Sequence, residues 1–238
     1  MTGTNSANSV DAIILAGGFG TRLQAVVSDV PKPLAPVNGR PFLDIILAQL
    51  DRFGSVRKVV LAIGHKADAV QARYGNVRHY NFDIGFSVEP KPLGTGGAIG
   101  KALPLTASRD VLVLNGDSYV EFDLRDLTAT HAGNGASVTM VVVEMQNTAR
   151  FGSVKLDESG KKVVGFAEKS GSEGHGFINA GCYLLARSAF DGLPPEASSF
   201  EKDILPQYLA STYAQVVTGK FIDIGVPESY LLADEYLR

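Results

Sequence analysis

The sequence is poor in the residues that mark several protein classes. It contains one cysteine, Cys182, no tryptophan and three methionines among 238 residues. A lone cysteine excludes an intrachain disulfide, and the apolar run NAGCYLLA around it predicts a buried core thiol. Nothing in the sequence therefore indicates a disulfide-stabilised fold or a cysteine nucleophile.

Long runs of one kind of residue are also missing. The 22 basic and 25 acidic residues leave a net charge of −3, and no cluster of Lys or Arg predicts a nucleic-acid surface. No apolar segment approaches the roughly 18 residues of a membrane span. The polar start MTGTNSANS, residues 1–9, has no signal-peptide pattern. We expect this start to be disordered, and the protein to be cytoplasmic with neither nucleic acid nor membrane as partner.

What the sequence does contain is an alternation of two periodicities. Hydrophobic residues make up 45% and charged residues 20%, which is enough for a sizeable core. Short apolar runs, rich in branched residues, occupy 10–15, 58–63, 84–88 and 111–114. Stretches with helical spacing lie between them, at 41–53, 66–74 and 95–103. This alternation predicts an α/β fold with a mainly parallel central sheet flanked by helices.

The second half of the chain is less regular. Its pattern predicts strands at 136–143, 176–186, 213–217 and 220–224, a hairpin of 153–156 with 162–168 about the turn 157–160, a loop at 187–198, and helices at 200–210 and 227–236. Ser198 or Ser199 is expected to cap the first of these helices, and Pro206 to bend or end it. We expect a single domain, 1–238, with a small β-rich insertion at about 145–180.

A glycine-rich loop, LAGGFGTRL at residues 15–23, follows the first apolar run. Such a loop lets the backbone come close to an anion and point its N–H groups at phosphate oxygens. A dinucleotide fingerprint fails because Leu23 stands at the third glycine position, and a Walker loop fails because Arg22 stands where it requires glycine. The segment PKPL follows at 31–34, and its two prolines stiffen the backbone that carries Lys32.

Together, LAGGFGTRL and PKPL resemble the signature of the sugar-phosphate nucleotidylyltransferases, the nucleotide-sugar pyrophosphorylases. The resemblance implies their Rossmann-like mixed sheet, with the loop around a nucleoside triphosphate and with Arg22 and Lys32 neutralising its phosphates. A second segment, VEPKPLGTGGAIGKAL at 88–103, matches the part of the family that recognises the base. The residues so expected to bind the nucleotide are Leu15, Ala16, Gly17, Gly18, Gly20, Thr21, Glu89, Gly94, Thr95 and Asn115.

Two aspartates complete the predicted catalytic set. LNGDSYV carries Asp117 at the end of an apolar strand, and FIDIGVPESY carries Asp223. Open α/β sheets bind ligands at the carboxyl ends of their strands. The two residues match the family's metal-binding pair, which implies Mg²⁺ as cofactor, held by two carboxylates with phosphate and water.

The sugar phosphate is assigned by the same resemblance. FAEKSGSEGHGFINAG carries Glu168 and Lys169, which match the family's Glu-Lys-Pro segment except that Ser170 replaces the proline, and Asn179, which matches its Asn-Ala-Gly. RFG at 150–152 adds Gly152. The implied roles are phosphate binding for Lys169 and sugar binding for the other three.

The reaction implied is attack of a sugar 1-phosphate on a nucleoside triphosphate, giving a nucleotide-sugar and pyrophosphate. The attacking oxygen is already anionic at pH 7, so positioning and charge neutralisation are expected to replace a general base. Glu89 can accept paired hydrogen bonds from guanine, which favours GTP over UTP or dTTP, although backbone groups can also bind a base.

Several members of the family are compatible with these motifs. LGTGGAIGKALP, LNGDSYVEFDL and FIDIGVPESYLLADEYL look most like the enzymes that act on D-glycero-α-D-manno-heptose 1-phosphate for surface polysaccharides. N-acetylmuramate 1-phosphate uridylyltransferase and mannose 1-phosphate guanylyltransferase are the alternatives, and a homodimer is compatible with each. A non-catalytic regulatory module is the alternative of another class, but the presence of Arg22, Lys32, Asp117 and Asp223 argues against it.

Overall fold

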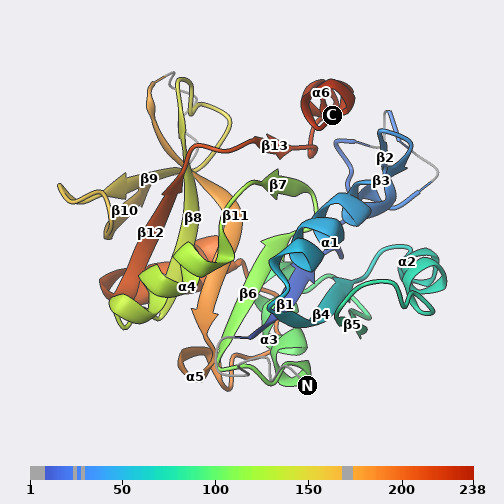
Figure 1. The fold of residues 1–238 in the computed structure, drawn as a ribbon, viewed down its shortest axis with the longest axis horizontal. Coiled ribbons are helices and arrows are strands. Elements are labelled where there is room, and N and C mark those ends of the chain that lie inside the picture. The colour runs from blue at the N-terminus through green and yellow to red at the C-terminus, as the bar shows by residue number, and fades with distance from the viewer. Residues whose placement is uncertain (1–8, 24–25, 28–29, 168–173) are drawn as a thin grey trace.

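The first half of the chain builds the parallel part of a nine-stranded sheet (Figure 1). The computed structural model describes residues 9–23, 26–27, 30–167 and 174–238. The parallel strands lie in the order β6 (Asp110–Asn115), β1 (Val10–Leu15), β4 (Val56–Ile63) and β5 (Asp83–Val88). The helices that follow β1, β4 and β5 along the chain are α1 (Phe42–Phe53), α2 (Ala67–Tyr74) and α3 (Gly94–Ala102). The predicted α/β fold, with its parallel strands and intervening helices, is confirmed.

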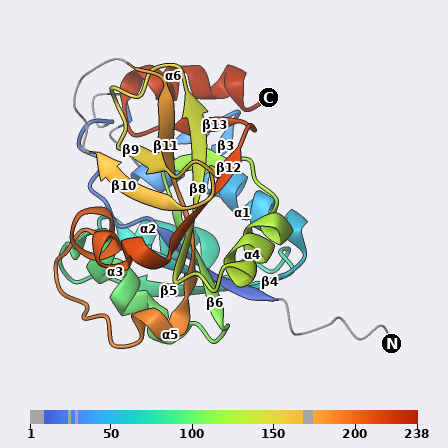
Figure 2. The same ribbon diagram turned by 90° about the vertical axis from the view of Figure 1, so that its left-hand side faces the viewer.

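Both faces of the sheet are covered, which explains why β1 is apolar from Ala12 to Leu15, while its Asp11 is buried and accepts the Ser108 N–H at 3.0 Å. Ala12 and Ile14 pack in the core on the side of α1 and α4, whereas Ile13 packs with α3 on the other side. Figure 2 shows α3 on one side of the sheet and α1 with α4 on the other. A strand buried on both faces has no position for a polar side chain that faces solvent.

The second half of the chain adds antiparallel pairs and one further parallel pair. Its strands are β8 (Val138–Met145), β9 (Ser153–Leu156), β10 (Val163–Ala167), β11 (Gly176–Ala186) and β12 (Thr212–Val217). Strand β11 is antiparallel to β6, β8 and β9, so it joins the two halves, and β12 is parallel to β8. The predicted hairpin is present as β9 and β10, and Asp157 accepts the Lys161 and Lys162 N–H groups at its turn.

The structure corrects part of the predicted second half. The segment expected to be a loop contains a short helix, α5 (Arg187–Phe190). The helix expected at 200–210 is a π-helical turn, Phe200–Ile204, followed by a 3₁₀ helix, Leu205–Ser211. Ser199 caps it as predicted, by accepting the Lys202 N–H at 3.2 Å. Pro206 lies in the first turn of the 3₁₀ helix, directly after the π-helical turn ends at Ile204.

Other elements were not expected from the sequence. These are α4 (Leu124–Gly133), the strand β7 (Ser118–Val120), which pairs with the predicted β13 (Phe221–Asp223), and a small ladder of β2 (Pro36–Val37) with β3 (Arg40–Pro41). The closing helix α6 (Pro227–Tyr236) has the predicted bounds. None of the described helices is both long and apolar enough to cross a membrane. The prediction of a disordered start concerns residues 1–8 chiefly, which lie outside the described residues.

Candidate active site

The glycine loop begins where β1 ends. A Cβ on Gly17 would lie 2.6 Å from Glu89 Oε1 and 3.3 Å from the Gly64 backbone N, so a side chain there would have to displace the Glu89 carboxylate. Gly20 has a φ of 59°, a left-handed conformation that other residues adopt only with strain. Gly18 has open space around it, which leaves its backbone accessible to a ligand. The loop therefore has a backbone that side chains leave accessible, as the sequence predicted.

A cavity of about 370 Å³ lies against this loop. Every residue predicted to bind the nucleotide lines it, together with Arg22, Lys32 and Asp117. The lining residues come from the ends of β1 and β6, from the start of α3 and from the segment after β5. The cavity thus lies at the carboxyl edge of the parallel strands, as the rule for open α/β sheets predicts.

Asp117 and Asp223 are brought together by the pairing of β7 with β13. Asp223 lies opposite Ser118 in that ladder, and the Ile224 N–H donates to the Asp117 carbonyl at 2.9 Å. Burial raises the pKa of Asp223, and the neighbouring Asp117 charge raises it further, whereas Lys32 and Arg22 oppose the shift. A raised pKa with these causes identifies two carboxylates that share one electrostatic environment.

Lys32 is the cation closest to this pair. Its Nζ bonds to Asp117 Oδ2, and its side chain is only 11% exposed. A Cβ on Gly225 would lie 2.6 Å from Asp223 Oδ1 and 3.0 Å from Lys32 Nζ, so the ammonium and the second carboxylate also lie close together. Lys32 is thus a largely buried cation fixed by its bond to Asp117, rather than a solvated surface lysine.

The two carboxylates fit a magnesium ion by their chemistry. Mg²⁺ takes one or two carboxylates and completes its coordination with water and phosphate oxygens. Asp223 Oδ1 accepts the Gly225 N–H at 2.6 Å, which orients the carboxylate. Within the described residues, no cluster of three or more His, Cys, Asp or Glu forms a metal site.

Glu89 also lines this cavity. Its N–H donates to the Ile63 carbonyl at 2.7 Å, which extends the pairing of β5 with β4, and its Oε2 accepts the Leu93 N–H at 3.0 Å. Burial raises the pKa of Glu89, against the lowering effect of the Leu93 N–H and of Lys101. The side chain is thus a half-buried carboxylate with a fixed orientation.

A second cavity, of about 610 Å³, is lined by Asp223 and by Ser118, the residue after Asp117. Its lining includes two of the residues predicted to bind the sugar, Gly152 and Asn179, as well as Asp223. Asn115 lines both cavities, and in the described part of the molecule its buried Oδ1 has no hydrogen-bond partner. A buried acceptor without a partner at this junction is suited to a donor on a ligand. Glu168 and Lys169 lie outside the described residues.

Several residues of the second cavity were not predicted. They are Ser118, the aromatic residues Phe151, Phe166 and Phe221, and the group Ser199, Glu201 and Lys202. Ser199, Glu201 and Lys202 line the cavity because the turn after Ser198 packs on the start of α3. No local sequence pattern predicts a contact between positions so far apart in the chain. Cys182 is buried as predicted, and burial raises the pKa of its thiol.

The match to a known family agrees with this geometry. Residues 11–238 match the model of the family described as nucleotidyl transferase. The chain belongs to the nucleotidyl transferase family. It is 37% identical over 232 residues to the D-glycero-alpha-D-manno-heptose 1-phosphate guanylyltransferase of Aneurinibacillus thermoaerophilus, covering 96% of this chain and 99% of that protein.

Two further nucleotidyl transferases help to place the chain. The mannose-1-phosphate guanylyltransferase of Mycobacterium tuberculosis is 33% identical over 95% of this chain, which spans 64% of that protein. The crystal structure of HddC from Yersinia pseudotuberculosis complexed with GMP-PN superposes with a TM-score of 0.85 at 35% identity, covering 96% of this chain and 100% of that one. The fold expected from the sequence is therefore the fold of this family.

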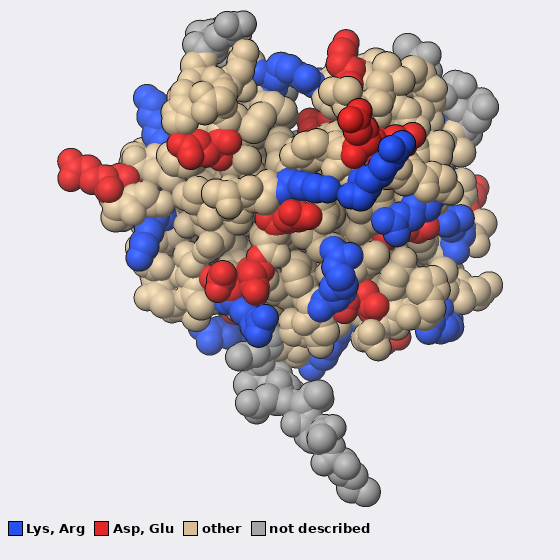
Figure 3. Space-filling model, turned by 45° about the horizontal axis from the view of Figure 1, so that its top comes forward, with Lys and Arg blue, Asp and Glu red and all other residues tan. Residues whose placement is uncertain are grey.

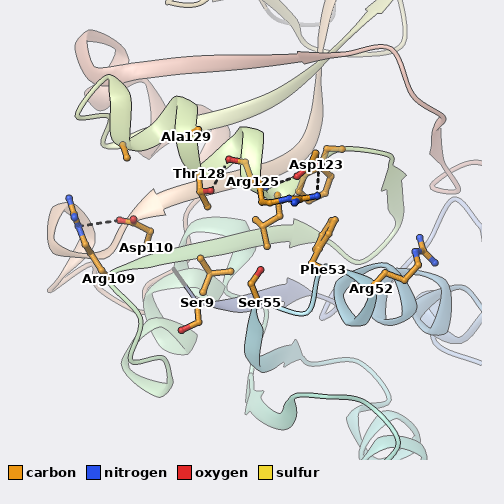
Figure 4. Close-up of a pocket in the computed structure, with 14 residues that line it drawn as sticks. Ser9, Arg52, Phe53, Ser55, Arg109, Asp110, Asp123, Arg125, Thr128 and Ala129 are labelled. Carbon is orange, nitrogen blue, oxygen red and sulfur yellow. Dashed lines mark hydrogen bonds and ion pairs between the residues drawn. The ribbon is translucent and has the colours of Figure 1, made fainter. Parts of the chain in front are cut away.

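A larger cavity in this nucleotidyl transferase lies elsewhere. It measures about 870 Å³ and opens at the amino ends of β1 and β6, whereas the glycine loop follows the carboxyl end of β1. Figure 4 shows Arg109 paired with Asp110 there, at 3.9 Å, and Arg125 paired with Asp123, at 3.6 Å. Two of its arginines, Arg109 and Arg125, pair with neighbouring aspartates, and the cavity lacks the glycine loop, so size does not identify the active site.

Charge is mixed on one face of the molecule. On the face drawn in Figure 3, Lys and Arg side chains lie interspersed with Asp and Glu side chains. This agrees with the small net charge of −3. A small net charge of mixed signs creates little long-range field, so attraction of an anion depends on the cations near its site.

Proposed function

We propose that this protein transfers a guanylyl group from GTP to D-glycero-α-D-manno-heptose 1-phosphate, releasing GDP-heptose and pyrophosphate. The observation that carries the proposal is the meeting of two cavities at Asp117 and Asp223, with Asn115 lining both. One cavity has a phosphate-binding loop and the other is open to a polar ligand. Two substrates bound in them would have their phosphates next to the same carboxylates. The relatives' substrates and the coverage of nearly the whole chain support the choice of GTP and heptose phosphate.

The chemistry is an in-line displacement at the α-phosphorus of the nucleotide. A sugar-phosphate oxygen forms a bond to that phosphorus, and the bond from it to the bridging oxygen of pyrophosphate breaks. Arg22 and Lys32 hold positive charge beside the leaving pyrophosphate, which develops negative charge as the bond breaks. No proton must be removed from the attacking oxygen, because it is anionic at neutral pH.

The metal proposed for the site is Mg²⁺, held by Asp117 and Asp223. When bound, it would supply positive charge that offsets the repulsion between the two phosphorylated substrates. The chain's own part is to hold both carboxylates in place, through the β7–β13 ladder and through the Gly225 N–H on Asp223. Lys32, which bonds to Asp117, is proposed to turn toward nucleotide phosphates when they enter the cavity.

Guanine is proposed to bind at Glu89. Its carboxylate lines the nucleotide cavity and is oriented by the Leu93 N–H. The N1–H and the exocyclic amine of guanine form a pair of donors that a carboxylate accepts, whereas uracil presents one N–H between two carbonyls. Glu168 and Lys169 are proposed, on the family resemblance, to bind the sugar and its phosphate.

The test is a matrix of GTP, UTP, dTTP and CTP against the 1-phosphates of heptose, mannose, glucose and N-acetylmuramate, with pyrophosphate release as the readout. We expect the fastest release from GTP with the heptose phosphate. Faster turnover with mannose 1-phosphate would favour the alternative acceptor, and faster turnover with UTP would contradict the role of Glu89. No release from any pair would refute the proposed activity.

A further inference from the structure

Glu201 occupies an unusual position between the two cavities. It lies in the π-helical turn Phe200–Ile204 and lines the second cavity. Its Oε2 accepts the hydroxyl of Thr95 at 2.7 Å and that of Ser199 at 3.2 Å, and its Oε1 accepts the hydroxyl of Tyr183 at 3.3 Å. One carboxylate therefore binds both the start of α3 and the central strand β11.

On the nucleotide side, Glu201 is part of a tight junction. Thr95 lines the nucleotide cavity, and its hydroxyl accepts the Phe200 N–H at 2.7 Å while it donates to Glu201. The Gly96 N–H donates to the Ser198 carbonyl at 2.9 Å, and the Ser198 N–H donates to the Leu93 carbonyl at the same distance. The start of α3 and the turn that carries Glu201 are thus held as one unit.

On the sugar side, the link passes through a buried tyrosine. Tyr183 is fully buried, and burial together with the Glu201 charge raises its pKa, so its hydroxyl stays protonated as a donor. That hydroxyl accepts the Asn179 amide N–H at 2.6 Å, and Asn179 Oδ1 accepts the Gly181 N–H at 2.9 Å. Both ends of the Asn179 amide are therefore oriented, and this side chain lines the second cavity.

The hydrogen bonds that link Asn179, Tyr183 and Thr95 to Glu201 all run from donor to acceptor toward the Glu201 carboxylate. Asn179 donates to Tyr183, Tyr183 donates to Glu201, and Thr95 donates to Glu201 from the other side. The carboxylate is the acceptor at which the two halves meet, and an amide of the same shape would offer acceptors on one side only. A hydrogen-bonded network of this kind loses more than one bond when its central acceptor is removed.

We propose that Glu201 is a positioning residue that couples the two substrate sites, so that nucleotide binding at Thr95 improves sugar-phosphate binding at Asn179, and the reverse. This inference rests on the proposed function, because it requires that both cavities bind their assigned substrates. Such coupling is reciprocal by thermodynamic necessity: each substrate must raise the affinity for the other by the same factor. Glu201 acts through Thr95 and Tyr183, and the reaction chemistry stays with the aspartate pair.

The experiment measures this coupling factor directly. Dissociation constants for the α,β-methylene analogue of GTP and for heptose 1-phosphate are measured by calorimetry, each alone and with the other present. For the wild-type protein we expect a factor of about 5 or more, the lower end of common coupling between sites. In Glu201→Gln we expect the factor to fall to about 1–2, while the analogue alone binds within about threefold of wild type.

Two further variants keep the proposal open to refutation. Tyr183→Phe removes only the hydroxyl that links Glu201 to Asn179, so it should lower the coupling factor in the same way even where Glu201→Gln folds poorly. Glu196→Gln, an exposed glutamate of the preceding loop, makes the same chemical change and should retain wild-type coupling. Thermal unfolding of each variant verifies that the protein is folded.

The outcomes separate the two proposals. Coupling unchanged in both Glu201→Gln and Tyr183→Phe, in a protein that turns over GTP and heptose 1-phosphate, would overturn the role of Glu201 and leave the proposed function standing. A wild-type coupling factor of 1 would do the same. Absence of turnover and of binding in the wild-type protein would overturn both.

Discussion

Gly94→Ala is expected to destabilise the fold and to weaken nucleotide binding together. Gly94 has a φ of 66°, and a Cβ there would lie 2.3 Å from the Ser198 carbonyl oxygen and 3.0 Å from its carbon. The left-handed conformation costs about 1–2 kcal/mol for a residue with a Cβ. The overlap is with backbone that is hydrogen-bonded to Gly96, so it must be relieved by displacement of the turn, at about 1–3 kcal/mol.

The total loss expected for Gly94→Ala is about 2–5 kcal/mol in the free energy of unfolding. Urea denaturation measures it as a midpoint lowered by about 1 M or more, with an unchanged slope. Because Gly94 and Thr95 line the nucleotide cavity, the KM for GTP should rise in the same variant.

Gly133→Ala is the matched control. Gly133 ends α4 without a positive φ, and a Cβ there would meet nothing within 4 Å. Its stability should differ from wild type by less than about 1 kcal/mol, in the stabilising direction if at all. A Gly94→Ala protein as stable as Gly133→Ala, with an unchanged KM for GTP, would refute the argument that this close approach positions the cavity.

The remaining predictions concern the charged groups of the site. Asp117→Ala and Asp223→Ala should each abolish pyrophosphate release while the protein stays folded by circular dichroism, and near wild-type release in Mg²⁺ buffer by either variant would contradict the metal assignment. Lys169→Ala should mainly raise the KM for the sugar phosphate, and a change confined to nucleotide binding would show that its role is misassigned. GTP affinity should fall as pH decreases through the raised pKa of Glu89, because protonation removes the acceptor for guanine, and this loss should begin at a higher pH than for an ordinary glutamate. Glu89→Gln should lack that pH-dependent step, and the same acid profile in both proteins would assign the effect to the phosphates.

The parallel half of the fold was predictable because its signals are local. Strand β1 is buried on both faces, which leaves the apolar run at 12–15, and the glycine loop follows it directly. The residues that line the cavity against the glycine loop could be grouped from the sequence for the same reason, with help from the family resemblance. Each lies within a short motif whose backbone conformation depends on glycine or proline nearby.

The elements that were missed have weak local signals. Helix α4 turns only Leu124, Leu127 and His131 toward the interior, so its apolar pattern is too sparse to predict a helix. Strand β7 has only three residues, and it is a strand because it pairs with β13, about a hundred positions later in the chain. The role of Glu201 depends on contacts with Thr95 that only the folded chain creates.

The bond between Lys32 and Asp117 has a consequence for the protein before any substrate arrives. A lysine nearly closed off from water neutralises one acid of a pair whose mutual repulsion would otherwise oppose folding of this edge. The same ammonium that is proposed to face phosphates thus serves the empty protein as an internal counter-ion. Replacing Lys32 by an uncharged residue would then harm the resting molecule as well as its reaction, and stability and turnover cannot be optimised separately at this position.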